Sequence, residues 1–127
     1  MQPAAESVMS ISGGEGMAEA RTPRPGRPVR GSTTGRPVMA ALDLLGRRWT
    51  LRVVWELYQQ PAGFRELQRR CDQMSSSVLN TRLNELTEAR IVVGDADGYR
   101  LTALGRDLVT ALAPLQAWSK RWDRAIR

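Results

Sequence analysis

The sequence of 127 residues contains no histidine and only one cysteine, Cys71. Zinc sites, Cys-His dyads and Ser-His-Asp triads therefore lack a necessary member. There is also no glycine-rich phosphate loop after a predicted strand. These absences argue against an enzyme, so we expect no catalytic residue, no metal and no cofactor. A lone cysteine cannot form an internal disulfide, which favours a reducing compartment.

Long apolar runs are absent too. No stretch approaches the roughly 18 consecutive apolar residues of a membrane-spanning helix. The N-terminus lacks the charged start and apolar core of a secretion signal. We therefore expect a cytoplasmic protein without membrane association.

Lysine is scarce, since arginine supplies every one of the 19 basic residues except Lys120, against 13 acidic residues. Guanidinium groups form bidentate contacts with phosphates and guanine edges. A net charge of +6 favours a polyanionic partner, although from Pro37 onward 14 basic residues stand against 10 acidic ones. The basicity of that part is therefore modest.

Composition divides the chain into residues 1–36 and 37–127. The first segment is rich in Gly, Pro, Ser, Ala and Arg and has no periodicity, so we predict a disordered basic tail. Its arginines alternate with prolines: Arg21, Arg24, Arg27, Arg30 and Arg36. Two interpretations stay open, a solvated tail and a basic arm that follows DNA phosphates.

From Pro37 the pattern becomes helical. Proline suits the first turn of a helix, and Gly46 is expected to end it. The apolar positions at helical spacing are Val38, Ala41, Leu42 and Leu45. A second helix is predicted over 49–58, and Pro61 and Gly63 separate it from the next element. Its buried candidates are Leu51, Val54, Trp55 and Tyr58.

A short third helix is expected over 64–70, with Phe64, Leu67 and Cys71 facing inward. Asp72 and Gln73 form the turn that follows, and Ser75 is a good N-cap for a fourth helix. The apolar stripe of that helix is Val78, Leu79, Leu83 and Leu86. Its opposite face is short-chained and polar: Ser77, Asn80, Thr81, Asn84 and Glu88. A helix of this kind can enter the major groove and read base edges.

A hairpin and a long helix complete the pattern. The β-branched run 91–93, a turn over 94–98 and an extended run over 99–101 predict the hairpin. Thr102 is the expected N-cap of the last helix, which Pro114 should kink or split. Its heptad seam is Leu104, Leu108, Ala111, Leu115, Trp118, Trp122 and Ala125, widened by Leu112 and Ile126. We predict that this seam packs against a second copy of the chain. The alternative is that it folds back on its own domain.

The chain resembles the HxlR-type winged helix-turn-helix regulators, which are related to the MarR and ArsR groups. The resemblance covers residues 36–122 and ends with Trp118 in the last helix. The matching stretches are PVMAALDLLGRRWTLRVVWEL, PAGFRELQRR, SSSVLNTRLNELTEA and YRLTALGRDL. It implies a mainly α fold with a small β-hairpin, a winged helix-turn-helix with a long C-terminal dimerisation helix. It further implies a homodimer on pseudo-palindromic double-stranded promoter DNA, with recognition helices roughly 34–36 Å apart.

The resemblance also implies site residues. The expected DNA-binding residues are Arg65, Ser75, Ser76, Ser77, Asn80, Thr81, Arg82, Asn84 and Arg100. The first and last helices would build the dimer, through Val38, Leu42, Leu108, Ala111, Leu112, Leu115, Trp118 and Trp122. A small-molecule effector between the lobes is a further expectation, with Trp49, Trp55, Trp118 and Trp122 lining the space or filling it.

The chain departs from the family pattern at three places. Many members begin with Cys-Pro-Val and some use that cysteine as a sensor, whereas this chain has Arg36, Pro37 and Val38. Cys71 stands elsewhere, and we interpret it as a partly buried small apolar residue. Arg90 replaces the glycine after the recognition helix, so a left-handed backbone there would cost about 1–2 kcal/mol.

The wing is the remaining departure, because Asp95 and Asp97 lie at its tip. Two carboxylates near phosphate are unfavourable, so we expect no deep minor-groove contact. Arg100 at the wing base is the better phosphate candidate.

Some side chains keep two interpretations. Arg82 falls within the apolar stripe, so it forms an internal ion pair with Asp43, Glu56 or Glu85, or it clamps a phosphate. Asn80 and Asn84 could pair with adenine or lie on a solvated face. Arg47 and Arg48 reach DNA or solvent, and Trp49 and Trp55 are expected in the core.

The function that these patterns favour is a sequence-specific transcriptional regulator, a repressor that lies on the nucleoid when bound to DNA. The alternative is a protein-interaction adaptor on the same fold, without specific DNA readout.

Overall fold

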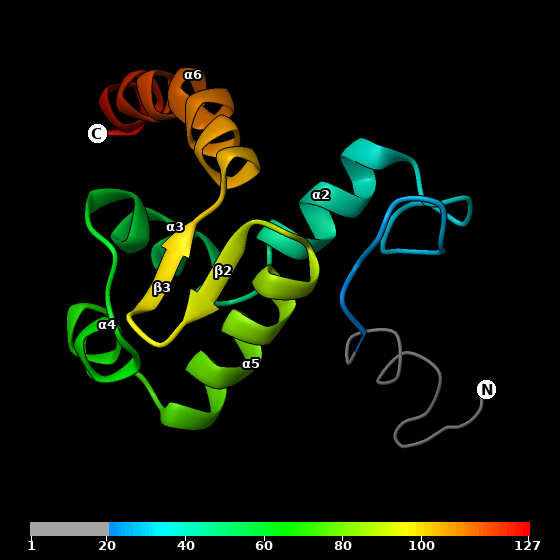
Figure 1. The fold of residues 1–127 in the computed structure, drawn as a ribbon. Helices are drawn as coiled ribbons and strands as arrows, with labels where there is room; N and C mark the ends of the chain where they lie inside the picture. Colours follow the sequence, from blue (N-terminus) through cyan, green and yellow to red (C-terminus); the bar gives the residue numbers. More distant parts are fainter. Residues whose placement is uncertain (1–20) are drawn as a thin grey trace. The chain divides into compact units, whose positions relative to one another are not determined.

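The computed structural model describes residues 21–127, and the chain divides into two compact units between Arg48 and Trp49. The elements run α2 (Pro37–Leu45), α3 (Thr50–Gln59), α4 (Phe64–Arg70), α5 (Ser76–Glu88), β2 (Val92–Asp95), β3 (Gly98–Leu101) and α6 (Ala103–Ile126) (Figure 1). The expected fold class is confirmed: the chain is mainly helical with one antiparallel hairpin and a long last helix.

The first unit contains α2 and the loop that precedes it. Pro37 occupies the first turn of α2, as expected, and Gly46 ends the helix with a right-handed φ of −79°. Ala40 and Leu44 are buried, whereas Val38 and Leu42 are 61% and 57% exposed. The predicted disordered tail lies outside the described residues for positions 1–20.

Helix α3 is the centre of the second unit, because it packs against α4, α5, α6 and β3. The predicted buried set of α3 is wrong for three of its members, since Leu51, Trp55 and Tyr58 are 38–43% exposed. Only Val54 of that set is buried. The side chains that join it in the core are Thr50, Val53 and Leu57.

The error has a physical cause. This helix has apolar side chains on two adjoining faces, and a period of 3.6 residues alone does not decide which face points inward. The face that carries the smaller side chains is buried. On the exposed face, Trp55 and Tyr58 stack on each other with ring centroids 5.7 Å apart.

The helix-turn-helix forms as the sequence predicts. Leu67 and Cys71 are fully buried, and Phe64 is half-buried. The turn has two consecutive left-handed residues, Asp72 and Gln73, with φ of 58° and 57°.

The hairpin pairs Val92 with Leu101 and Asp95 with Gly98 in antiparallel register. The loop before α4 joins this sheet through Ala62, which exchanges two backbone hydrogen bonds with Tyr99, of 3.1 and 2.8 Å. A β-carbon on Gly98 would lie 2.8 Å from the Ala62 carbonyl oxygen, so this crossing requires glycine. The wing is therefore fixed at its base.

The start of α6 is held against Arg90 and Ile91, the two residues that precede β2. Thr102 caps α6 by accepting a hydrogen bond from the Gly105 amide, and its hydroxyl donates to the Arg90 carbonyl at 2.7 Å. Gly105 approaches so closely that a β-carbon would lie 2.4 Å from the Ile91 carbonyl oxygen. The direction in which α6 leaves the domain is thereby set.

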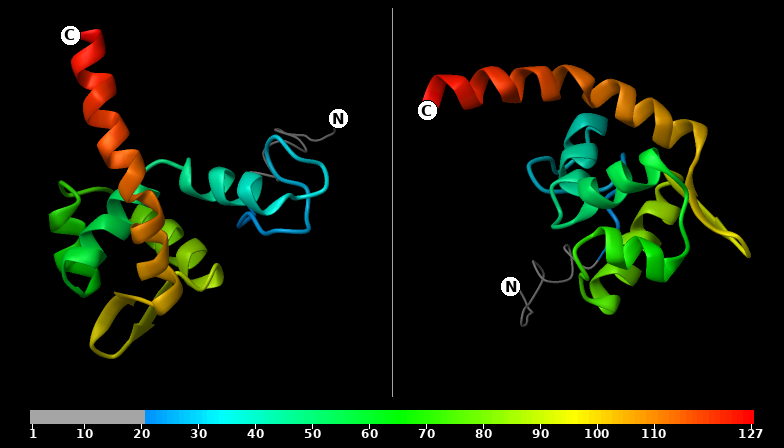
Figure 2. Two further views of the ribbon diagram at one scale, coloured as in Figure 1. Left: turned by 90° about the horizontal axis from the view of Figure 1, so that it is seen from above. Right: turned by 90° about the vertical axis from the view of Figure 1, so that its left-hand side faces the viewer.

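Helix α6 continues for 24 residues through Pro114. It is not split, and it curves along its length instead (Figure 2). Proline removes the donor for the Thr110 carbonyl, and both residues are exposed, so water can satisfy that oxygen. The C-terminal half of α6 extends beyond α3 and the hairpin in both views of Figure 2.

Candidate nucleic-acid interface

The candidate interface is centred on α5. Ser75 caps this helix, as predicted, by accepting a hydrogen bond of 3.1 Å from the Val78 amide. Leu79, Leu83 and Leu86 are at most 1% exposed and fix the inward face. The opposite face is exposed along its whole length, at Ser77, Asn80, Thr81, Asn84 and Glu88.

The polar groups of this face differ in what they already bind. Within residues 21–127 neither Asn80 nor Asn84 has a hydrogen-bond partner for its side-chain amide. Thr81 is exposed, but its hydroxyl already donates to the Ser77 carbonyl at 2.9 Å. Ser76 accepts a hydrogen bond of 3.0 Å from Gln68. The two asparagines are thus the best-placed groups for pairing with a base edge.

Sequence reasoning missed two residues that hold the turn between α4 and α5. The Gln68 amide donates to both the Met74 carbonyl, at 2.9 Å, and the Ser76 hydroxyl. Arg52 on α3 donates to the Arg70 carbonyl at 2.7 Å and to Asp72 at 3.2 Å. Neither residue gives a sequence signal of this role, because each binds a backbone carbonyl and a side chain that only the folded turn brings within reach.

Arg52 also binds Glu56, one helical turn along α3, at 2.9 Å. The hydrogen bond from the guanidinium to Glu56 raises the pKa of Arg52, with a further contribution from Asp72. Of the contacts of Arg52, only the i,i+4 pair with Glu56 is apparent from the sequence. Its bonds to Asp72 and to the Arg70 carbonyl depend on the tertiary fold.

The predicted phosphate contacts fall into two groups. Arg65 is exposed near the start of α4, and no acidic group among residues 21–127 pairs with it. Arg82 instead donates to Glu85 at 2.7 Å, with side chains 18% and 7% exposed. That bond agrees with the internal ion pair that we considered, and Glu85 is the partner.

Arg100 is also committed, because it forms an ion pair with Asp95 across the hairpin. The hydrogen bond from Arg100 holds the pKa of Asp95 below its ordinary value, and the Asp97 amide lowers it further. The positive charge of Arg100 is therefore neutralised by Asp95. A free cation is absent from this position.

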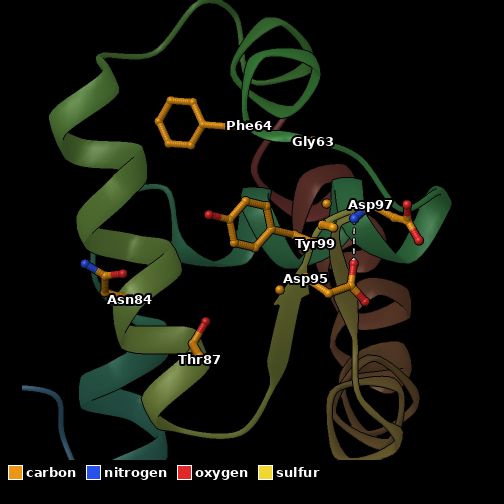
Figure 3. A pocket seen from close by; sticks show the side chains of 10 residues that line it. Gly63, Phe64, Asn84, Thr87, Asp95, Asp97 and Tyr99 are labelled. Atoms are coloured by element: carbon orange, nitrogen blue, oxygen red, sulfur yellow. Dashed lines mark hydrogen bonds between the residues drawn. The ribbon is translucent and has the colours of Figure 1, made fainter.

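A cavity of about 550 Å³ lies between α5 and the wing. Asn84 and Thr87 line it from the helix, and Tyr99 points toward α5 from β3 (Figure 3). Asp95 and Asp97 line it from the hairpin, and the Asp97 amide donates to the Asp95 carboxylate at 2.9 Å (Figure 3). Thr87 and Tyr99 are absent from the predicted site because a helical wheel does not show what the hairpin brings alongside.

The predicted dimer residues are mostly exposed in the single chain. Leu115, Trp118 and Trp122 are 48–52% exposed, and the two indole rings stack 5.7 Å apart at 6°. Leu108 and Leu112 are half-buried, while Ala111 is exposed. An apolar seam of this length on a helix surface is typical of an interaction site.

Cys71 is fully buried, and desolvation raises the pKa of its thiol, which fits a small apolar residue. Trp49 is half-buried with a left-handed φ of 76°. Among the described residues, no three His, Cys, Asp or Glu side chains come together where a metal could bind. None of the helices between Arg21 and Arg127 combines the length and apolar content that a bilayer crossing requires.

Comparison with known proteins agrees with this architecture. The family model described as HxlR-like helix-turn-helix matches residues 44–126. The HTH-type transcriptional regulator YvaP of Bacillus subtilis is 29% identical over 89 residues, which cover 65% of this chain and 82% of YvaP. The HTH-type transcriptional regulator YodB of the same organism is 28% identical over 99 residues, covering 72% of this chain and 88% of YodB.

Solved structures give the same result. The crystal structure of quinone-bound YodB from B. subtilis matches with a TM-score of 0.64 and 31% identity, over 66% of this chain and 96% of that one. A possible HxlR family transcriptional factor from Thermoplasma volcanium matches with a TM-score of 0.60 and 25% identity, over 69% and 85% of the two chains. The α5 face, the hairpin and these matches together show that the chain belongs to the HxlR-like helix-turn-helix family and is a transcriptional regulator with a helix-turn-helix DNA-binding domain.

Proposed function

We propose that the protein is a homodimeric repressor that binds a pseudo-palindromic promoter site and reads its sequence through α5. One observation carries the proposal: the outward face of α5 presents two asparagine amides without partners among residues 21–127, while its inward face is fully buried. Such a helix can lie in the major groove without disturbing its own core. The protein acts in the cytoplasm, on the nucleoid.

The contacts divide by chemistry. Asn80 and Asn84 each pair bidentately with an adenine, which is worth about 1–3 kcal/mol of discrimination per base. Ser77 and the Thr81 methyl group contact neighbouring base edges. Arg65 binds a phosphate beside the groove and fixes the register of α4 and α5 on the duplex.

The dimer is formed by the exposed apolar side chains of α6, with Val38 and Leu42 of α2 adding to it. Two-fold symmetry would place two copies of α5 about one DNA turn apart. A dimer bound across a promoter blocks the polymerase from the same DNA, which is why we propose a repressor.

The test is a fluorescence anisotropy titration on the promoter of the protein's own gene, with random duplex as the competitor. Asn80→Ala and Asn84→Ala should each weaken specific binding about 10- to 100-fold and leave random-duplex binding unchanged. The matched control is Gln59→Ala, which removes an exposed amide from α3. Equal affinity of the wild type for every duplex would overturn the proposal and favour the adaptor.

The oligomeric state needs its own measurement. Sedimentation should show a dimer at micromolar concentration, and Trp118→Glu with Trp122→Glu should shift it to the monomer. Monomeric wild type at that concentration would contradict the dimer and, with it, the palindromic site.

An effector is part of the proposal as well. YodB has been crystallised with a quinone, and this chain exposes two stacked aromatic pairs, Trp55–Tyr58 and Trp118–Trp122. We propose that a planar apolar molecule stacks on these rings. Titration with a benzoquinone should quench tryptophan fluorescence and lower DNA affinity, and unchanged DNA affinity would count against it.

A further inference from the structure

The loop over residues 21–36 is the part of the structure that the family match, which begins at residue 44, does not cover. Five arginines lie in it, and no acidic residue occurs from 21 to 42. The second unit contains no comparable run of one sign. The loop therefore carries a large part of the net positive charge in a small part of the chain.

This loop has a specific backbone structure. Gly26 donates to the Gly35 carbonyl at 2.9 Å, and Val29 and Ser32 exchange two backbone hydrogen bonds of 2.9 and 3.1 Å. A β-carbon on Gly35, whose φ is +72°, would lie 2.2 Å from the Arg27 carbonyl oxygen. Only glycine fits there, so the sequence specifies the turn.

The loop is also tied to α2 within its own unit. The Arg30 amide donates to Asp43 at 3.3 Å, and the Arg47 guanidinium donates to the Arg21 carbonyl at 2.6 Å. Arg36 closes the loop, since its amide donates to the Ser32 hydroxyl at 3.0 Å. None of these bonds uses the guanidinium group of Arg24, Arg27 or Arg36.

Those three guanidinium groups are consequently available. Arg24, Arg27 and Arg36 are exposed, and none of them forms an ion pair with a residue in the described part of the chain. Three adjacent cations without counter-charges repel one another, which favours binding of a polyanion. The loop lacks aromatic side chains and side-chain amides, so it has little with which to read a base.

We propose that residues 21–36 form a folded arm that binds the phosphate backbone of duplex DNA without reading its sequence. The inference rests on the proposed function, because it assumes that α5 brings the protein to DNA. It also completes that function: Arg100 is paired with Asp95 and Asp97 adds a negative charge to the wing, so phosphate contacts beyond the one assigned to Arg65 come from outside the wing. Arginine on a preformed loop supplies them at a small ordering cost.

The salt dependence of binding gives the decisive measurement. Each phosphate contact releases condensed counterions, so the slope of log K against log salt changes by about 0.9 per contact on duplex DNA. Loss of three contacts should therefore make the slope shallower by about 2–3. Affinity for the promoter and for random duplex should fall by the same factor, because the contacts carry no sequence information.

The experiment uses the full chain and anisotropy titrations from 50 to 400 mM salt, a range of about eightfold that resolves this slope. The test variant is Arg24→Gln with Arg27→Gln and Arg36→Gln. The matched control replaces Arg106, Lys120 and Arg124 of α6 by Gln, which changes the net charge equally at exposed sites. A third variant, Gly35→Ala, keeps every charge but cannot keep the turn.

The expected result is a shallower slope for the test variant, a slope within about 0.5 of wild type for the α6 control, and an intermediate loss for Gly35→Ala. An unchanged slope in the test variant overturns the arm, and so does an equal change in the control. Wild-type behaviour of Gly35→Ala overturns the folded form of the arm. Failure of the proposed function looks different, since Asn84→Ala would then leave promoter binding unchanged.

Discussion

The ion pair between Arg82 and Glu85 decides between two roles for an arginine on the recognition helix. The two side chains are 18% and 7% exposed and their charged atoms lie 2.7 Å apart. A guanidinium in this position stabilises the fold if it neutralises Glu85, and it binds DNA if it turns toward phosphate. Arg82→Met and Glu85→Met, singly and together, separate these roles.

The magnitude follows from burial. Removal of one partner from a fully buried pair costs about 3–5 kcal/mol, because the other charge remains without compensation. Since Arg82 keeps some contact with solvent, we expect about 2–3 kcal/mol for each single variant. The double variant should recover most of this loss, because it removes both charges of the pair and replaces them by apolar side chains of similar volume. In thermal unfolding each single variant should lower Tm by roughly 8–20 °C.

The assay is thermal unfolding at one fixed protein concentration, because self-association would otherwise shift Tm. The matched control is the pair Asp123–Arg127, whose charged atoms are 2.6 Å apart but whose side chains are 51% and 77% exposed. Its double-mutant coupling should be below about 1 kcal/mol. If Arg82→Met leaves Tm unchanged and instead reduces the DNA salt slope by about 1, the structural role is refuted.

Three further predictions concern single positions. Arg90→Gly should raise stability by about 1 kcal/mol, because Arg90 has a φ of 63° that glycine adopts without strain; a lower Tm would contradict this. Thr50→Val should be neutral or stabilising by up to about 1 kcal/mol, since the Thr50 hydroxyl is buried with no hydrogen-bond partner among residues 21–127; a loss measured in urea would show a missed partner. Cys71 should react with iodoacetamide at least about 100-fold more slowly in the native protein than in urea, because burial raises the pKa of its thiol and shields it. The part of that protection due to the raised pKa is present below the thiol's unfolded pKa and should be lost as pH rises through the folded value. Fast native alkylation at pH 7 would refute the prediction.

Local rules predicted α5 and its surroundings well. Ser75 and Thr102 were recognisable as caps because a hydroxyl before an apolar helix satisfies an amide that the helix leaves free, and both bonds form. The inward face of α5 was predictable because it has a single apolar stripe. The hairpin followed from a β-branched run before a turn and an extended run after it. In each of these cases the sequence pattern favoured a single local structure.

The orientation of α3 and the state of the arginines could not be predicted in this way. Helix α3 offers two apolar faces, and only packing against four neighbouring elements selects the face with Val53 and Leu57. Arg100 was expected to contact a phosphate, and the hairpin register places Asp95, five residues away in sequence, beside its guanidinium group. Partners that are distant in sequence are set by the tertiary fold, so a sequence shows the presence of a charge but not its availability.

The arginines of this chain fall into two groups, those paired with carboxylates and those without an acidic partner among residues 21–127, and we expect the two groups to contribute differently to DNA binding. The second unit commits Arg52, Arg69 and Arg70 to carboxylates of its own and uses them to fix the turn and α4. Guanidinium groups in such ion pairs hold α5 in a fixed position. Because their charge is already neutralised, they add little to the nonspecific attraction that brings a protein to DNA. In the proposed arm, Arg24, Arg27 and Arg36 would restore that attraction, because no acidic residue among residues 21–127 pairs with them. Under this proposal specificity and attraction can be adjusted independently: changes on α5 would alter which site is bound, and changes in the loop would alter how strongly any DNA is bound at a given salt concentration.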